Sequence, residues 1–232
     1  MTPTDLLDAA CDFPWQDGIF KHLERHIASV DRFQALAHDL QSKEICDAIS
    51  AETDPVALGE LQYELTRFDE EDAFSSQRVI WGGLLVSIYA TFEHGLEQIF
   101  GHWQLATDCS AFKAKGGEDI LSAAIRHSND SIALPLFEAT SEHDCLDQLR
   151  ILRKSFVHKG GRIAAIPPDI WVAIQSRKHI GFPFEVVDER WCANAFAAQY
   201  YLQVAHRVMR RFGHAVFAKS ATSLPNGKPF DS

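Results

Sequence analysis

The amino-acid sequence predicts an all-α protein, and three observations carry that prediction. Apolar residues recur at three- and four-residue steps through long stretches of the chain, as they do on the buried face of a helix. Capping residues and glycines stand at the starts and ends of those stretches. Only one short stretch, residues 184–187, has the character of an extended segment. We therefore expect helices throughout and very little strand.

The composition is that of a globular protein, because 46% of the 232 residues are hydrophobic and 23% are charged. No window rich in proline, glycine and serine and no internal repeat divides the chain. We expect a single domain over residues 1–219, followed by a flexible C-terminal tail over residues 220–232.

Three further features favour a cytoplasmic protein without a membrane partner. The first ten residues contain Asp5 and Asp8 and no basic residue before a hydrophobic run, unlike a signal peptide. The longest charge-free apolar window, residues 79–92, is shorter than the roughly twenty residues that a membrane-spanning helix needs. The five cysteines are scattered and odd in number, which argues against a disulfide framework or a cysteine zinc site.

The first half of the chain is expected to form three long helices. The first covers residues 17–49, and the second begins where Asp54 and Pro55 supply an N-cap and a first-turn proline. An acidic loop, residues 69–72, is expected to end the second helix. The third, residues 76–103, is apolar on nearly every face and is expected to be the central core helix. Three of its glycines are expected to permit close helix packing: Gly82, Gly83 and Gly95.

Shorter elements are expected to follow. Helices are predicted over residues 108–115 and 118–127, and Ser141 is expected to cap a helix that ends at Gly160 and Gly161. A short helix over residues 169–175 and the extended stretch at 184–187 should come next. Asp188 is then expected to cap the last helix, residues 189–217.

Charge is distributed unevenly along the chain. Residues 1–149 carry a net charge of −18 and residues 150–232 a net charge of +8, within a total of −10. An acidic protein repels nucleic acids, but a basic part of its surface can still bind phosphates. The asymmetry therefore favours a basic surface contributed by the C-terminal part.

Arg153 occupies an unusual position on its predicted helix. On a helical wheel that starts at Leu149, Arg153 falls at about 40°, inside the apolar arc. A permanently charged group at such a position is unexpected unless the protein uses it. His158 lies about 140° further around the helix. The two side chains can therefore meet through the reach of Arg153, an opened helix end at residues 159–160, or a second subunit across a two-fold axis.

The stretch Leu-Arg-Ile-Leu-Arg-Lys-Ser-Phe-Val-His-Lys-Gly-Gly-Arg-Ile, residues 149–163, resembles the signature of the HEPN family. That signature is an Arg, four to six residues and a His at a helix end, often followed by Gly. The apolar helix over residues 79–100, with Glu93 after its apolar run, also resembles the earlier core helix of the family. The resemblance implies a HEPN-like antiparallel helical bundle with additional helices. One departure is Lys154, since many members have Asn or a small polar residue there.

The resemblance also implies a function, that of a metal-independent endoribonuclease without a cofactor. The ribose 2′-hydroxyl would attack the adjacent phosphate, with Arg153 and His158 as catalytic residues. Lys154 and Lys159 are candidates for phosphate contacts, and Glu93 is a candidate to orient the catalytic pair. Further candidates for RNA binding are Arg150, Arg162, Arg207, Arg210 and Arg211.

The same resemblance suggests partners and a role in the cell. Family members commonly form homodimers in which the paired motif helices share one cleft. A toxin or defence effector would act on RNA in the cytoplasm and could be held in check by an antitoxin or another protein partner. These expectations rest on the family alone.

Three alternatives stay open. The first is a catalytically inactive HEPN-like module that binds a protein, nucleotide or RNA partner. In the second, Arg153 bridges to an acid and His158 interacts with the helix C-terminus, so that both are structural. The third is a metal-dependent hydrolase centred on His22 and His26, which lie four residues apart on one helix face but lack an evident third ligand.

Overall fold

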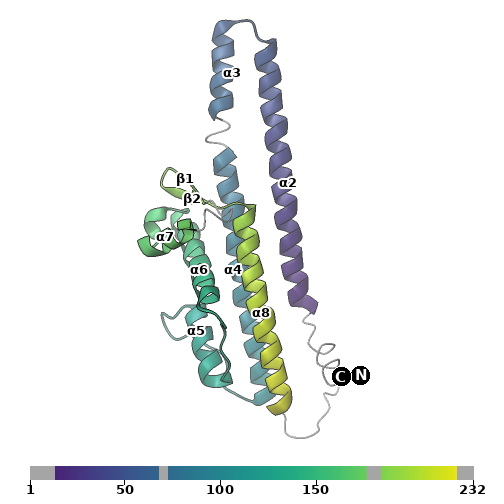
Figure 1. The fold of residues 1–232 in the computed structure, drawn as a ribbon, viewed down its shortest axis with the longest axis vertical. Helices are drawn as coiled ribbons and strands as arrows, with labels where there is room; N and C mark the ends of the chain where they lie inside the picture. The colour runs from purple at the N-terminus through teal and green to yellow at the C-terminus, as the bar shows by residue number, and fades with distance from the viewer. Residues whose placement is uncertain (1–13, 68–72, 177–183, 224–232) are drawn as a thin grey trace. The chain divides into compact units, whose positions relative to one another are not determined.

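The computed structural model describes residues 14–67, 73–176 and 184–223 (Figure 1). These residues form seven α-helices and one two-stranded sheet, so the predicted all-α fold class is confirmed. The helices are α2 (Pro14–Ala51), α3 (Pro55–Arg67), α4 (Ala73–Thr107), α5 (Ile120–His127), α6 (Thr140–Lys159), α7 (Pro168–Gln175) and α8 (Ala195–Ser223). The strands are β1 (Glu185–Val187) and β2 (Arg190–Cys192), and short helical turns cover Ser128–Ile132 and Ile163–Ala165.

The predicted start of α3 is confirmed, whereas the prediction that Ser141 caps α6 is wrong, because that helix begins at Thr140 and already includes Ser141. The Asp54 carboxylate accepts a hydrogen bond from the Val56 amide at 3.2 Å, and Pro55 is the first residue of α3. The Asp119 carboxylate likewise accepts from the Ser122 amide at 3.0 Å at the start of α5. Each cap satisfies an amide that the helix itself leaves without a partner.

The predicted helix over residues 108–115 is wrong. Asp108 has a φ of +53°, which ends α4 at Thr107, and no helix covers the segment that follows. Phe112 from this segment instead lies against Phe100, with ring centroids 4.6 Å apart. The next turn is fixed by Glu118, whose carboxylate accepts from the Lys115 amide at 2.9 Å. A tertiary contact and a side-chain bond thus replace the expected helix.

The predicted start of the last helix is also wrong. Asp188 and Glu189 have φ values of +51° and +59° and form the two-residue turn of a hairpin in which Val187 pairs with Arg190. The cap of α8 is Asn194, whose side-chain oxygen accepts from the Ala197 amide at 2.9 Å.

Helix α8 continues to Ser223, and Ser220 is buried, so the first residues of the expected tail are helical. Residues 1–13, the acidic loop at 69–72, and residues 224–232 lie outside the described residues.

The chain divides into two compact units. Unit 1 consists of Met1–Lys21, Ile88–Leu149 and Tyr201–Ser232, and unit 2 consists of His22–Ser87 and Arg150–Tyr200. Helices α2, α4, α6 and α8 each contribute residues to both units. That residues 1–219 form a single domain stays a prediction.

The core of unit 1 is built around α4, as the sequence predicts. Ile88, Tyr89, Phe92, Leu96, Ile99 and Phe100 are fully buried. The Phe100 ring meets the His127 ring edge-on at 4.9 Å and the Phe212 ring at 5.8 Å. These aromatic contacts join α4 to α5 and α8.

By length and composition, the Ser75–Thr107 portion of α4 could also cross a membrane. Half of its most apolar window is buried in the protein, and the core helix of a soluble protein passes the same test of length and composition. This helix alone is weak evidence for a membrane partner.

The aromatic core of unit 1 encloses a titratable group. His127 is 5% exposed, and its ring contacts the rings of both Phe100 and Phe112. Burial lowers the pKa of His127 below its usual value, and the neighbouring Arg126 adds to this effect while Asp130 opposes it. The imidazole is therefore neutral in the folded protein at neutral pH.

We expect the protein to lose stability as the pH falls below about 6.5. At such a pH His127 is protonated in the unfolded chain but still neutral in the folded protein, so protons favour the unfolded state. Urea unfolding at about pH 7.5 and pH 5.5 measures the effect. The His127→Phe variant should lose less stability over this interval than the wild type. The exposed His26→Phe variant is the control and should behave as the wild type does. An equally steep loss in His127→Phe would contradict this assignment.

Candidate functional site at the basic end of helix α6

The last turns of α6 carry the two proposed catalytic residues, Arg153 and His158, and both belong to unit 2. Arg153 is half-buried, and its Nε atom is inaccessible to solvent. Lys154, His158 and Lys159 are exposed. Leu149, one helical turn before Arg153, is fully buried and Arg153 itself is half-buried, as expected for the predicted position of Arg153 on the apolar side of its helix.

Helix α6 stays regular through Lys159, and this limits how the two motif side chains can meet. His158 is part of the helix, so it lies about 140° around the helix axis from Arg153. An opened helix end, one of the three expected routes, is therefore not present in this structure. Two of the expected routes by which Arg153 and His158 can meet remain. These are the length of the Arg153 side chain and a second copy of the chain.

The helix ends at two glycines, as predicted. Gly160 and Gly161 have φ values of +59° and +80°, a conformation that glycine adopts with little strain. The Gly160 amide donates to the Phe156 carbonyl at 3.0 Å, and the Gly161 amide donates to the Ser155 carbonyl at 3.1 Å. These bonds cap carbonyls of the last turn and turn the chain sharply after Lys159.

A buried hydrogen-bond chain holds this helix end in place. The Ser155 hydroxyl donates to the Arg162 carbonyl at 2.9 Å, and the Trp191 indole Nε1 donates to the Ser155 oxygen at 3.3 Å. Ser155 is 2% exposed and Trp191 is fully buried. Polar contacts of this kind, shielded from water, fix the loop after the motif relative to the helix that carries it.

The β-hairpin adds a second attachment. The Trp191 amide donates to the Gly161 carbonyl at 3.0 Å, and the Ile163 amide donates to the Glu189 carbonyl at 2.9 Å. Arg162 consequently pairs through its backbone with Arg190. Arg190 was missed by the sequence reasoning, which assigned it to a helix, and no local motif marks it.

Close packing against α4 supports the same turn of α6. The Phe156 ring lies so near Gly82 that a β-carbon there would overlap it. The expectation that Gly82 permits close helix packing is therefore confirmed. It is wrong for Gly83, because a β-carbon there would meet nothing within 4 Å.

Three exposed side chains of the motif and of the loop after it are basic. Lys154, Lys159 and Arg162 are exposed, and within the described part of the chain none of them pairs with a carboxylate. Arg150 is half-buried earlier on the same helix. Cations also suit the C-terminal end of a helix, where the backbone dipole is negative. The arrangement can attract a phosphate without any bound metal.

Glu93 lies on α4 and belongs to unit 1, whereas Arg153 and His158 belong to unit 2. It is half-buried. Its role in orienting the catalytic pair stays a prediction.

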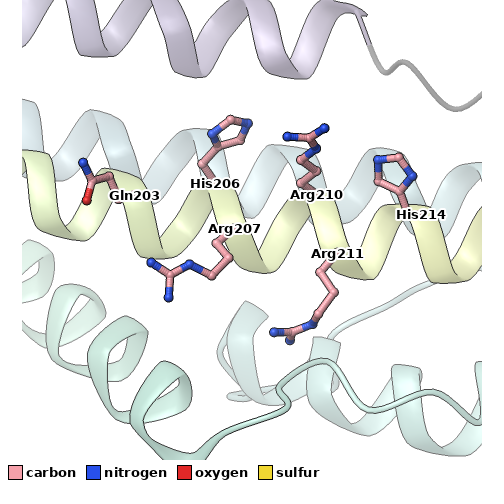
Figure 2. Close-up of a pocket in the computed structure, with 6 residues that line it drawn as sticks. All are labelled: Gln203, His206, Arg207, Arg210, Arg211 and His214. Atoms are coloured by element: carbon pink, nitrogen blue, oxygen red, sulfur yellow. The ribbon is translucent and has the colours of Figure 1, made fainter. Parts of the chain in front are cut away.

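The basic residues of α8 form a separate group in unit 1. Arg207 and Arg210 are exposed, whereas Arg211 is half-buried and donates two hydrogen bonds to Glu142, at 2.9 and 2.8 Å, and one to the Leu136 carbonyl at 2.9 Å. Arg211 therefore fastens α8 to the start of α6. A groove of about 540 Å³ follows this face of α8 (Figure 2). It is lined by Gln203, His206, Arg207, Arg210, Arg211 and His214.

Gln203, His206 and His214 were not singled out from the sequence. Their four-residue spacing from the arginines is the signal that could have found them, because residues four apart lie on one helix face.

The two histidines of the metal hypothesis lie in another hollow, of about 460 Å³, in unit 2. The His22 and His26 rings are stacked 6.2 Å apart. Its other lining residues are Leu23, Val30, Ile80, Gly83, Leu84 and Ser87, none of which is a usual metal ligand apart from the serine hydroxyl. Among the described residues no group of three His, Cys, Asp or Glu side chains could hold a metal ion. The geometry therefore gives the metal-dependent hydrolase no support.

The cysteines of the described residues bear on the predicted absence of a disulfide framework. The described cysteines form no disulfide with one another. Burial raises the pKa of the Cys192 thiol to about 12, so this thiol stays protonated and is a poor nucleophile.

Comparison of the chain with protein-family models, with curated proteins and with solved structures finds no match. The HEPN resemblance therefore stays a prediction, and any function has to be argued from the residues themselves.

Proposed function

We propose that this protein is a metal-independent endoribonuclease of the HEPN type, with Arg153 and His158 as its catalytic residues. One observation carries the proposal. The end of α6 combines a half-buried guanidinium with an exposed imidazole, on a basic surface that a buried hydrogen-bond chain holds in place. Guanidinium and imidazole are the two groups that phosphodiester cleavage without a metal needs.

The proposed reaction is an internal transfer of a phosphodiester bond. His158 accepts the proton of the ribose 2′-hydroxyl, whose oxygen then attacks the adjacent phosphorus. The bond from phosphorus to the 5′-oxygen breaks, and that oxygen takes up a proton from a protonated His158. The products are a 2′,3′-cyclic phosphate and a free 5′-hydroxyl. The Arg153 guanidinium donates to the non-bridging oxygens, whose negative charge increases in the transition state.

A site made by two copies of the chain accommodates the angle between these side chains. Because Arg153 and His158 lie about 140° apart on α6, one phosphate reaches both more easily when each comes from a different copy. Val157 lies between them, is apolar and is 53% exposed, so a second copy would cover it. We therefore propose a homodimer in which two α6 ends face each other.

The experiment is cleavage of single-stranded RNA in the presence of EDTA. The wild type is expected to cut it and leave 2′,3′-cyclic ends, and His158→Ala should be slower by about 100-fold or more. His26→Ala removes an exposed histidine elsewhere in unit 2 and should cut as the wild type does. Cleavage that needs an added metal, or that is unchanged in His158→Ala, would refute the proposal.

The second candidate is a catalytically inactive HEPN-like module that binds a protein, nucleotide or RNA partner. The observation that favours it is Lys154, an exposed cation directly after Arg153 where many family members have a small polar residue. Wild-type protein that binds RNA but leaves it intact in EDTA would support this candidate over the nuclease.

A role as a toxin or defence effector in the cytoplasm, with an antitoxin or another protein as partner, follows from the resemblance alone. Growth arrest on expression of the wild type, relieved by His158→Ala, is the result expected of a toxin.

A further inference from the structure

Helix α8 has an unusual composition for a helix of an acidic protein. Its 29 residues include Arg207, Arg210, Arg211 and Lys219 and no Asp or Glu, although the whole chain contains 32 acidic residues. Solvated helix faces usually mix both signs of charge, because pairs of opposite charge four residues apart stabilise a helix. The lack of acidic residues on α8 therefore calls for a partner that supplies negative charge.

The polar residues that line the groove on α8 form two rows. Gln203, Arg207 and Arg211 are spaced by four residues, and so are His206, Arg210 and His214. Figure 2 shows Arg207 and Arg211 pointing to one side of α8, and His206, Arg210 and His214 pointing to the other. Four helical residues rise by about 6 Å, so each row runs along the helix for about 12 Å. Arg207 and Arg210 thus stand in different rows, one on each side of this face of the helix (Figure 2).

The groove residues differ in how far their charges are already satisfied. Arg211 is bound by Glu142, and the His206 ring stacks on Phe20 with centroids 4.8 Å apart. Arg207 and Arg210 are exposed, and no described carboxylate lies within ion-pair distance of either. Arg211 and His206 are therefore held in place by other parts of the protein. The guanidinium groups of Arg207 and Arg210 are available to bind a ligand.

We propose that this groove binds the sugar-phosphate backbone of single-stranded RNA. A guanidinium fork matches the non-bridging oxygens of a phosphate, and the two exposed guanidinium groups, one on each side of the groove (Figure 2), suit a ligand that carries a phosphate at every repeat. The only rings among the groove's lining residues are the imidazoles of His206 and His214, and the His206 ring is already stacked on Phe20, so the groove offers bases little aromatic surface. Binding is accordingly independent of base sequence and sensitive to salt.

The choice of RNA as the ligand rests on the proposed ribonuclease function. The inference that the groove binds phosphates does not depend on that function. The groove belongs to unit 1, and Arg153 and His158 belong to unit 2. A substitution in the groove therefore leaves the proposed catalytic residues intact, and binding can be measured separately from cleavage.

The test measures the affinity of a labelled single-stranded RNA for the full-length His158→Ala protein in EDTA, so that cleavage does not interfere. Adding Arg207→Ala and Arg210→Ala is expected to raise the Kd by about 10- to 100-fold and to lower the magnitude of the slope of log K against log salt by about 1.4. The matched control adds Arg25→Ala and Lys43→Ala, which remove two exposed cations of α2 and should leave the Kd unchanged. All three proteins should melt at the same temperature.

Three results would overturn the proposal. An unchanged Kd in the groove variant would show that RNA does not bind there. An equal rise in Kd in the control would show that only the net charge of the protein matters. Displacement of the RNA by inorganic phosphate at a concentration equal to that of the RNA phosphates would show that the groove holds a single anion. The choice of RNA is tested with a single-stranded DNA of the same sequence. Binding of the DNA without binding of the RNA would refute that choice.

Discussion

Replacing Arg153 by alanine is expected to lower metal-free RNA cleavage by about 100- to 1000-fold, because its guanidinium stabilises charge that builds on the phosphate in the transition state. The loss should appear in kcat at saturating RNA, since this contact strengthens as the reaction proceeds. Cleavage rates and melting temperatures of the same preparations measure the effect.

Two further substitutions separate catalysis from packing at this half-buried position. Arg153→Met keeps an apolar stem of similar length without the charge, and it should be as inactive as Arg153→Ala but more stable. Arg153→Lys keeps the charge but loses the planar fork, so it should recover only part of the activity. A purely structural arginine would give the reverse pattern, with a lower melting temperature and wild-type cleavage by the protein that stays folded.

Replacing Trp191 by alanine should have the largest effect on stability, about 3–5 kcal/mol. Trp191 is fully buried, and its ring lies 5.7 Å from the rings of both Phe156 and Phe184. For a chain of this length the loss corresponds to a melting temperature lower by roughly 6–20 °C. Differential scanning calorimetry provides the measurement.

The Trp191→Phe variant isolates the contribution of the indole. It keeps an aromatic ring but loses the hydrogen bond from Nε1 to Ser155, which is worth about 1 kcal/mol. It should therefore melt only slightly below the wild type. If Trp191→Ala melted as the wild type does, the hairpin would not hold the end of α6 in the way proposed.

Local signals in the sequence were enough to place most helices. Asp54 with Pro55, and Gly160 with Gly161, act within a few residues of themselves, and the structure confirms both pairs. Helical periodicity alone also placed Arg153 inside the apolar arc of its helix, and the structure shows this residue half-buried.

The elements that sequence reasoning missed depend on contacts between distant residues. Residues 108–115 have a helical pattern, but the contact of Phe112 with Phe100 and the left-handed Asp108 favour an irregular segment. The hairpin is stabilised by Trp191, which contacts residues more than thirty positions earlier in the chain. No local pattern encodes such pairings, so Arg190 could not be placed beside Arg162 in advance.

The groove on α8 also combines features that the sequence reveals with features that depend on contacts between distant residues. Its arginines are visible in the sequence as a basic cluster. That Arg211 is held by Glu142 while Arg207 and Arg210 stay exposed depends on a pairing across 69 positions of sequence, which only the fold reveals.

The central claim is that Arg153 of one copy and His158 of another act on the same phosphate, and a mixture of Arg153→Ala and His158→Ala proteins tests it most directly. Each variant alone should be inactive in EDTA. After the two are dissociated and reassociated at equal concentration, half of the dimers are mixed and each holds one complete site, so about a quarter of the wild-type activity should return. Mixed dimers that form and yet cut no RNA would contradict the account.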